Sequence, residues 1–244
     1  MFEKAQNEKN KATYDFTTLW STQFFGFYQF KNFLEFASDQ SVQIDYLKSR
    51  DVIWGNENGE GHDIMSQVMI DFYLNDFADA VKLIKNQFIV FLFTRYEFVI
   101  QDTVKCLIND EPQRLLKILK IYPDYEKTLG FNLKDFINCQ IKEEYIALMS
   151  ERFANKILSG RPSKVLGRLR CLLTFKDIDE SVLDEIMDRR NKIVHEGHLY
   201  DMKISDLEFY YDAIENLLTV LSTALKNINI YVEDEGKILN GEHQ

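Results

Sequence analysis

The stretch "FLFTRYEFVIQDTVKCLI", residues 91–108, decides the fold class. Its buried-type residues fall on one stripe with a period of 3.6 residues: Leu92, Phe93, Tyr96, Val99, Ile100, Thr103 and Leu107. This period is that of an α-helix with one face in a core. From Ile64 to Ile108 the chain has no glycine or proline. We therefore predict one long helix, or two helices that meet near Asn75 or Asn86.

The rest of the chain also favours an all-α fold. The 244 residues include only three prolines and ten glycines, and no segment alternates apolar and polar residues as a half-buried strand does. We expect further helices over residues 17–36, 41–54, 113–121, 132–158, 163–173, 181–196 and 206–228. Gly197 is expected to end the helix before it, and Ser205 to cap the last one. Residues 1–12 are expected to be frayed, and residues 55–63 to form a loop.

The charge and cysteine content exclude several classes of protein. The formal net charge is −10, which disfavours non-specific binding to nucleic acid or an anionic membrane, so any nucleic-acid site must be a local positive patch. Cys106, Cys139 and Cys171 lie far apart and show no zinc or disulfide spacing, which is typical of a reducing compartment. No signal sequence or apolar run of bilayer length is evident. We expect a soluble, cytoplasmic protein with no metal or other cofactor and no membrane partner.

One charged stretch, "DEIMDRRNKIVHEGH", residues 184–198, departs from the pattern of an ordinary helix end. On a helix, Leu183, Ile186, Met187, Ile193 and Val194 form an apolar face, and Arg190 falls near its middle. A guanidinium there is costly unless it is paired or opens onto a polar cavity or partner. Asn191 and His195 are four residues apart and share the edge of this face, whereas Arg189 points elsewhere.

This combination of side chains suits phosphate chemistry. Arginine can hold a phosphate through two parallel hydrogen bonds, and histidine can give and take protons near neutral pH. On a straight helix Arg190 and His195 diverge by about 140°. A compact site would therefore need a bend in the helix or a second copy across a two-fold axis. The alternative is ordinary: cations near a helix C-terminus interact favourably with its dipole, and His195 could simply cap the last carbonyl groups.

The segment "RNKIVH", Arg190 to His195, resembles the signature of the HEPN superfamily (higher eukaryotes and prokaryotes nucleotide-binding domain). In that signature an arginine is followed by a polar residue, often asparagine, and by a histidine four to six residues after the arginine. The upstream "FLFTRYEFVIQD" is similar to an early HEPN helix that often contains an aromatic–Glu pair, here Tyr96–Glu97. The resemblance covers roughly residues 80–230. It implies a mostly up-and-down four-helix core, with additional N-terminal helices in this chain, and dimerisation that brings two motifs together.

The resemblance also implies an activity, because active HEPN members are metal-independent endoribonucleases. The RNA 2′-hydroxyl attacks the adjacent phosphate, giving a 2′,3′-cyclic phosphate and a 5′-hydroxyl. By resemblance, His195 is the general acid or base, Arg190 stabilises the phosphorane charge, and Asn191 orients the phosphate or the imidazole. Glu97 best matches an acidic residue that contributes in some members. A solvated carboxylate on the flank of its helix is an equally good reading of Glu97.

These observations lead to one main hypothesis and two alternatives. The main hypothesis is a homodimeric HEPN ribonuclease of a toxin or phage-defence system, with a possible antitoxin or defence partner. The first alternative is a non-catalytic HEPN-like module that binds nucleotides, RNA or protein, and the second is a helical scaffold with no ligand site. The basic residues Arg161, Lys164, Arg168 and Arg170, together with His198, are further candidates for RNA contacts, although a solvated helix face explains the basic run as well. We expect an N-terminal extension over residues 1–62 and a HEPN-like domain over 63–235.

Overall fold

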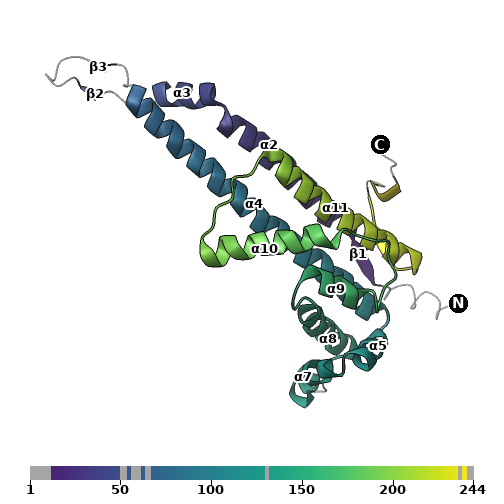
Figure 1. The fold of residues 1–244 in the computed structure, drawn as a ribbon. Helices are drawn as coiled ribbons and strands as arrows, with labels where there is room; N and C mark the ends of the chain where they lie inside the picture. Colours follow the sequence, from purple (N-terminus) through teal and green to yellow (C-terminus); the bar gives the residue numbers. More distant parts are fainter. Residues whose placement is uncertain are drawn as a thin grey trace.

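The computed structural model describes residues 12–49, 54–55, 62–63, 67–129, 132–235 and 238–240. Most of these residues are helical, which confirms the all-α prediction (Figure 1). The longer helices are α2 (Phe16–Ser38), α3 (Gln40–Ser49), α4 (Gln67–Asp110), α8 (Lys142–Ile157), α10 (Glu180–Glu196) and α11 (Ile204–Asn227). The shorter helical segments are α5 (Arg114–Ile121), η1 (Pro123–Tyr125), α6 (Glu126–Leu129), α7 (Leu133–Asn138), α9 (Pro162–Leu169) and η2 (Ile238–Asn240).

Helix α4 is the centre of the fold. It packs against α10 on one side, against α2 on the other, and against α11 along its buried face. The predicted stripe of α4 is fully buried, with Leu92, Val99, Ile100, Thr103 and Leu107 all 0% exposed. These four helices form an elongated bundle (Figure 1). The sequence-predicted helical face is therefore the face that organises the core.

The long helix α4 is continuous through Asn86, where a break was one of the two possibilities. The Asn86 side chain is fully buried, and its Nδ2 donates to the Lys82 and Tyr200 carbonyl oxygens at 2.8 and 2.9 Å. Its Oδ1 accepts from the Tyr200 backbone N–H at 2.9 Å. Asn86 therefore holds the loop after α10 against α4, and this satisfies the amide that would otherwise disfavour a buried helical position.

Helix α2 shares the core of the bundle, since Phe16, Leu19 and Leu34 belong to the same buried cluster as the α4 stripe. Polar contacts reinforce this packing. The Trp20 indole donates to Glu215 at 2.9 Å, Lys31 pairs with Glu208 at 2.6 Å, and Arg95 donates to the Leu19 carbonyl at 3.0 Å, each across the helix boundary. Not all of the aromatic side chains of α2 lie in this core, because several of their rings face solvent: Phe24, Phe25, Tyr28, Phe33 and Phe36.

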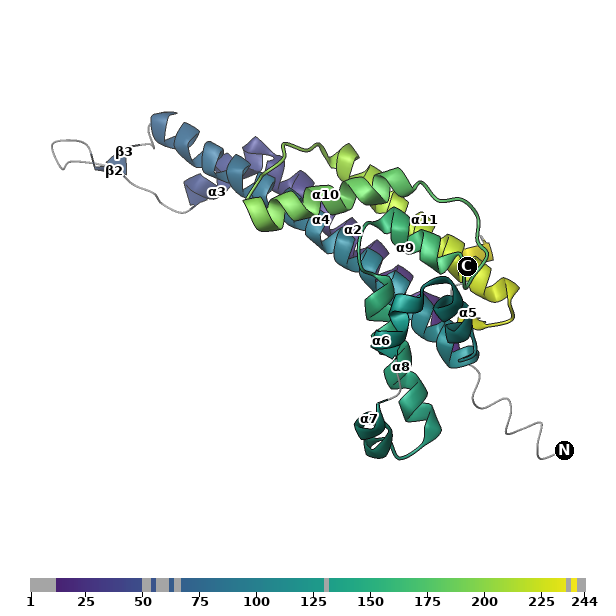
Figure 2. The ribbon, with the colours of Figure 1, turned by 60° about the horizontal axis from the view of Figure 1, so that its bottom comes forward.

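The second half of α8 packs on α4, whereas α6, α7 and the first half of α8 project from the bundle at an angle (Figure 2). The prediction of one helix over 132–158 was wrong, because the chain is extended at Cys139 and Ile141 between α7 and α8. Local polar groups stabilise this break. The Asn132 side chain caps α7, and the Gln140 N–H donates to the Glu144 carboxylate at 2.6 Å at the start of α8. Capping of this kind satisfies backbone groups as well as a continuous helix would.

Several predicted helix boundaries shift. The last helix is capped at Lys203 instead of Ser205, because the Asp206 carboxylate accepts from the Lys203 N–H at 2.9 Å. Helix α3 ends at Ser49, five residues before the expected end, and a short antiparallel pair joins β2 (Trp54–Gly55) to β3 (His62–Asp63) within the predicted loop. Residues 56–61 of that loop, and residues 1–11, lie outside the described chain. A parallel pair between β1 (Thr13–Asp15) and β4 (Tyr231–Glu233) was not predicted.

Candidate functional site

Helix α10 presents the RNKIVH motif at its C-terminal end. Asp179 caps the start of the helix, and Gly197 ends it in the left-handed conformation with φ of 66°, as the sequence predicts. Leu183, Ile186 and Ile193 are buried against the rest of the bundle. Val194 was expected on this buried face but is 47% exposed, because only Ile193 is still covered in the last turn.

Arg190, Asn191 and His195 lie together in a single copy of the chain. Arg190 Nη1 donates to Asn191 Oδ1 at 3.0 Å, and the same Nη1 lies 3.3 Å from His195 Nε2. The sequence argument expected a bend or a second copy to bring the arginine and histidine together. The long arginine side chain closes this gap instead, since it reaches across the helix surface to a ring five residues further on.

The contact between Arg190 and His195 constrains the proton on the imidazole. A guanidinium can only donate hydrogen bonds, so the contact is a hydrogen bond only while His195 Nε2 is unprotonated. Arg190 Nε and Nη2 donate to no residue in the described part of the chain. Arg190 also has no carboxylate within ion-pair distance among those residues. The nitrogen atoms Nε and Nη2 of Arg190 can therefore both donate to an anionic ligand.

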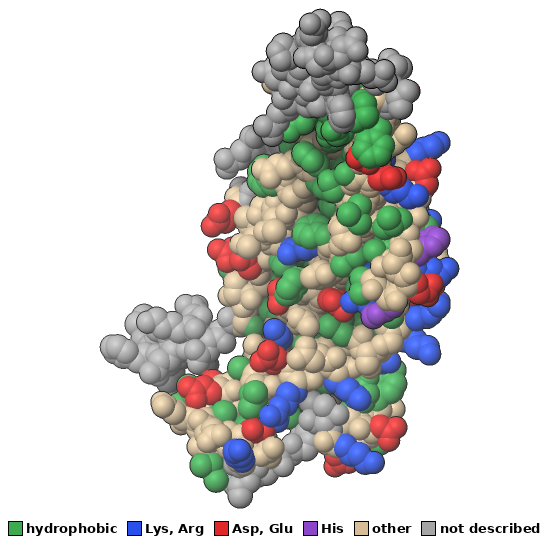
Figure 3. All heavy atoms as spheres, turned by 90° about the vertical axis from the view of Figure 1, so that its left-hand side faces the viewer, with side chains coloured by type: hydrophobic (Ala, Val, Ile, Leu, Met, Phe, Trp, Pro, Cys, Tyr) green, Lys and Arg blue, Asp and Glu red, His purple; other side chains and the backbone are tan. Residues whose placement is uncertain are grey.

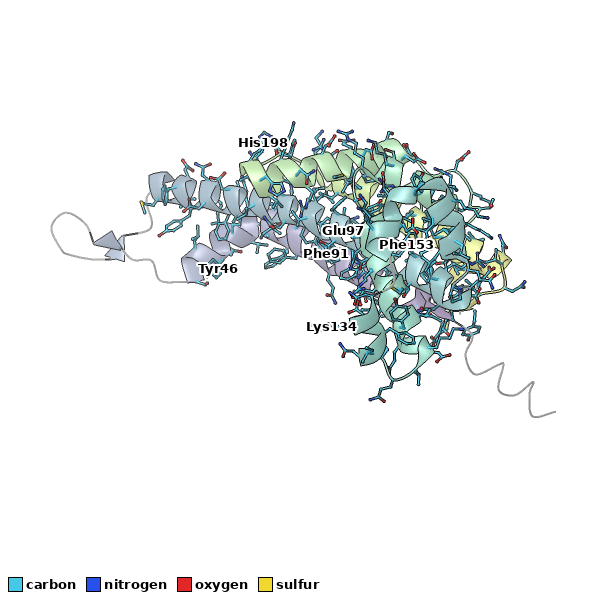
Figure 4. The ribbon with its side chains drawn as sticks, turned by 90° about the horizontal axis from the view of Figure 1, so that it is seen from below. Tyr46, Phe91, Glu97, Lys134, Phe153 and His198 are labelled. Carbon is cyan, nitrogen blue, oxygen red and sulfur yellow. The ribbon has the colours of Figure 1, made fainter. Side chains whose placement is uncertain are left out.

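Helix α4 contributes Phe93 and Glu97 to the same place. The Arg190 guanidinium lies 5.8 Å from the centroid of the Phe93 ring, and Glu97 follows Phe93 by one helical turn. Burial raises the pKa of the Glu97 carboxyl above its ordinary value, and the charge of Arg190 partly opposes this rise. Figure 4 shows Glu97 on α4, next to α10. The half-buried Glu97 thus faces the motif and is not a simple solvated carboxylate.

Arg189 has a different environment, although it is adjacent in sequence. Its Nε pairs with Glu185 at 2.9 Å, and its guanidinium lies over the rings of Tyr200 and Tyr210 at 4.7 and 5.4 Å. The Tyr210 hydroxyl also donates to Glu185, at 2.6 Å. Arg189 thus has a carboxylate and two aromatic rings as partners, which agrees with the expectation that it has an ordinary structural role.

The basic residues of α9 are mostly engaged inside the molecule. Arg161 pairs with Asp188 at 3.1 Å, and Arg170 pairs with Glu180. Arg168 donates to the backbone carbonyls of Ile157 and Ser159 at 2.7 and 2.5 Å. Lys164 is exposed and forms no ion pair with any described residue. Of the four predicted RNA contacts in this stretch, Lys164 has the most freedom to meet a phosphate.

His198 lies in the loop that follows the motif. It is exposed at the end of α10 (Figure 4). Its ring meets the Tyr200 ring edge-on, with the ring centroids 4.4 Å apart. Two anchors hold this loop to α4: the Asn86 amide on the backbone of Tyr200, and Lys85 Nζ, which donates to the Met202 carbonyl at 2.9 Å. The sequence argument missed both anchors. The only signal in the sequence was Asn86 itself, which is a poor helix former within a long stretch without glycine or proline.

Comparison with known proteins decides the family. The family model of RiboL-PSP-HEPN matches residues 69–227, which is well over half of the chain. The chain belongs to the RiboL-PSP-HEPN family. This confirms the HEPN resemblance and makes the chain a HEPN-type nuclease or RNA-binding module. No curated protein and no solved structure matches it.

The family match covers the candidate site. It begins near the start of α4 and ends with α11, so it contains Glu97 and the whole motif and excludes α2 and α3.

None of the described helices is both long enough and apolar enough to cross a membrane. No group of three or more metal-ligating side chains comes together in the described ranges.

Proposed function

We propose that this chain is a metal-independent endoribonuclease that works as a homodimer in a toxin or phage-defence setting. The observation that supports this most strongly is the Arg190 environment. The guanidinium has no carboxylate partner among the described residues, contacts an imidazole at 3.3 Å, and keeps two donors unused. An arginine in this state is suited to a phosphate, which accepts two parallel hydrogen bonds from it.

The proposed reaction follows from these groups. When Arg190 turns from the imidazole to the phosphate, His195 Nε2 is free to take the proton of the 2′-hydroxyl as the RNA 2′-oxygen attacks the adjacent phosphorus. The new bond between O2′ and phosphorus forms while the bond to O5′ breaks, and the departing 5′-oxygen takes up a proton from solvent or from the protonated His195 imidazole. Arg190 stabilises the charge that develops on the non-bridging oxygens. Asn191, which accepts from Arg190 at 3.0 Å, keeps the guanidinium oriented.

Glu97 is proposed as an auxiliary group at this site. Burial beside the motif raises the pKa of its carboxyl, and the charge of Arg190 acts on it. We propose that this carboxyl exchanges a proton with the substrate or helps to orient the Arg190 guanidinium. Lys164, Arg161, Arg168, Arg170 and His198 are proposed to be more distant contacts for the RNA. The engaged states of Arg161, Arg168 and Arg170 leave Lys164 and the exposed ring of His198 as the main candidates.

The experiment is RNA cleavage in the presence of EDTA, with the wild-type chain and His195→Ala compared on the same RNA. We expect the wild type to give fragments that end in a 2′,3′-cyclic phosphate, and His195→Ala to be at least about 100-fold slower. Expression in cells tests the biological setting: the wild type should arrest growth, and Arg190→Ala/His195→Ala should not. Equal metal-free cleavage by the wild type and His195→Ala would refute the proposal.

The second candidate function is a non-catalytic module that binds RNA, nucleotides or protein. The Arg190–His195 contact itself favours this reading, because an Nε2 atom that accepts from Arg190 is not free to accept a proton from a substrate. RNA binding without cleavage, lost in Arg190→Ala, would support this candidate over the nuclease. The nuclease and the binding module would therefore use the same residues, and they differ only in whether RNA fragments are formed.

A further inference from the structure

A cavity lies between the end of α2, helix α3 and the first half of α4. Its volume of about 320 Å³ is within the range of small-molecule sites in proteins. Figure 4 shows Tyr46, one of its lining residues, on α3 beside α4. Figure 3 shows hydrophobic side chains at the end of the bundle that α3 and the start of α4 form. Exposed side chains surround the mouth of the cavity: Phe33, Phe36, Tyr46 and Ala80. Buried or half-buried side chains of all three helices form its floor.

The wall of this cavity is mostly apolar. None of the described residues that line it is charged. Tyr46 and Phe77 form one side, with their rings edge-on and the ring centroids 6.3 Å apart. A charged ligand would lose its hydration here without gaining an ion pair, and an apolar wall gives water few hydrogen bonds. The cavity therefore suits an uncharged and mostly apolar molecule.

One amide, that of Gln43, completes the wall. Gln43 is 7% exposed, and its Nε2 donates to the Ala37 carbonyl oxygen. Because a carbonyl oxygen can only accept, this contact decides which end of the amide is the nitrogen. Gln43 Oε1 accepts a hydrogen bond from no residue in the described part of the chain. An acceptor on a buried side chain is costly unless a donor meets it, so a ligand with one N–H or O–H group fits this wall.

We propose that this cavity binds a small, uncharged, mostly apolar molecule that donates one hydrogen bond to Gln43 Oε1. The volume equals about ten times the roughly 30 Å³ that one water molecule occupies, which is enough for a bicyclic aromatic compound. A partner helix, about 10 Å across, is too wide to enter. Asp45 and Asp76 lie exposed, each one helical turn from a lining residue, and they disfavour anionic ligands and a second copy of this acidic chain.

The position of the cavity gives the N-terminal helices a role of their own. Helices α2 and α3 lie outside the family match, so the cavity is a site that they add to the HEPN-type core. On α4 the lining ends at Ile84, and the next two residues, Lys85 and Asn86, hold the loop that follows the RNKIVH motif. A ligand in the cavity therefore contacts α4 directly before these two anchors. Binding there requires no nuclease activity.

The test is isothermal titration calorimetry of the full chain, without RNA, with two probes of the same shape. Indole has one N–H donor, and benzothiophene has none. We expect indole to bind at a single site with a Kd below about 1 mM. Benzothiophene should bind about threefold to tenfold more weakly, which is the contribution of one neutral hydrogen bond.

Two matched substitutions on α4 locate the site. Ala80→Phe places a ring in the mouth of the cavity and should abolish indole binding. Ala78→Phe places the same ring two positions away, in a separate depression lined by Asp79, Lys82 and Asp201, and should bind indole as the wild type does. Gln43→Met keeps an apolar wall but removes the acceptor, so indole should bind to it only as tightly as benzothiophene does. This variant repeats the test from α3, in case Ala80→Phe fails to fold.

Three outcomes would overturn the proposal. The first is no saturable binding of either probe to the wild type, and the second is equal binding of indole by the wild type, Ala80→Phe and Gln43→Met. The third is tighter binding of benzyltrimethylammonium than of indole, which would show that the rings at the mouth hold a cation instead. Indole binding that is lost in Ala80→Phe, from a protein that cleaves no RNA, would keep this proposal and refute the nuclease.

Discussion

Two basic regions of the molecule differ in what surrounds their arginines. The stretch of residues 161–170 has the densest positive charge in the sequence, yet Arg161 and Arg170 pair with carboxylates and Arg168 with backbone carbonyls. Arg190, in a less basic stretch, meets an amide, an imidazole and a ring. From this difference we expect the site at Arg190, which lacks a charged partner among the described residues, and not in the stretch where arginines are most numerous.

The largest effect is expected when Arg190 receives a carboxylate partner like those of Arg161 and Arg170. In Asn191→Asp a carboxylate replaces the amide oxygen that now lies 3.0 Å from Arg190 Nη1. The resulting ion pair should compete with a phosphate and lower kcat/KM for RNA by about 1000-fold. Asn191→Ala removes the amide without adding charge and should lose clearly less. Equal losses in the two variants would show that neutralising Arg190 is not what matters.

Glu97→Gln tests the acidic group that lies near Arg190. The Glu97 pKa is raised by burial, so the protonated carboxyl favours folding at low pH, and this contribution is lost as the pH rises through the raised pKa. Glutamine cannot ionise, so the Tm of Glu97→Gln relative to wild type should increase from about pH 4 to about pH 7.

The same variant also reports on activity. If Glu97 takes part in proton transfer, RNA cleavage should fall by about 100-fold and lose the acidic limb of its pH profile. A pH profile and a rate that match the wild type would return Glu97 to a merely structural role. The Tm comparison stands in either case, because it depends on the surroundings of the carboxyl in the folded protein and not on the reaction.

The smallest effects are expected in α9, where the comparison predicts structural roles. Arg168→Ala leaves two carbonyl oxygens without their donor and should lower the free energy of unfolding by about 1–3 kcal/mol in urea titrations. Lys164→Ala removes an exposed cation and should weaken RNA binding by about twofold at low salt, with unchanged stability. A large loss of RNA binding in Arg168→Ala at unchanged stability would reverse the assignment.

The sequence predicts the parts of this structure that depend on short-range pattern. The 3.6-residue stripe identifies α4 and its buried face, and the glycine after the last apolar residue identifies the end of α10. Such a pattern does not predict how far a long side chain extends across the helix surface. The helical angle between Arg190 and His195 is correct, but it describes the directions of the Cβ atoms, and the arginine is long enough to cross that angle.

The features that the sequence did not predict depend on contacts between distant residues. Asn86 is tolerated inside a long helix because its amide pairs with the backbone of Tyr200, 114 positions away. The β1–β4 pair joins the two ends of the described chain. The sequence also does not tell which aromatic residues of α2 are exposed, because Phe25, Phe33 and Phe36 fit a core or an interface equally well until the bundle shows which face is covered.

The most direct test of the central claim compares two adjacent arginines in one assay. Arg190→Ala and Arg189→Ala remove the same charge from neighbouring positions, but only Arg189 has an ion-pair partner among the described residues. In metal-free cleavage of one RNA, the account predicts a loss of about 100-fold or more for Arg190→Ala and less than about threefold for Arg189→Ala. Equal losses in the two variants, both folded by circular dichroism, would contradict it.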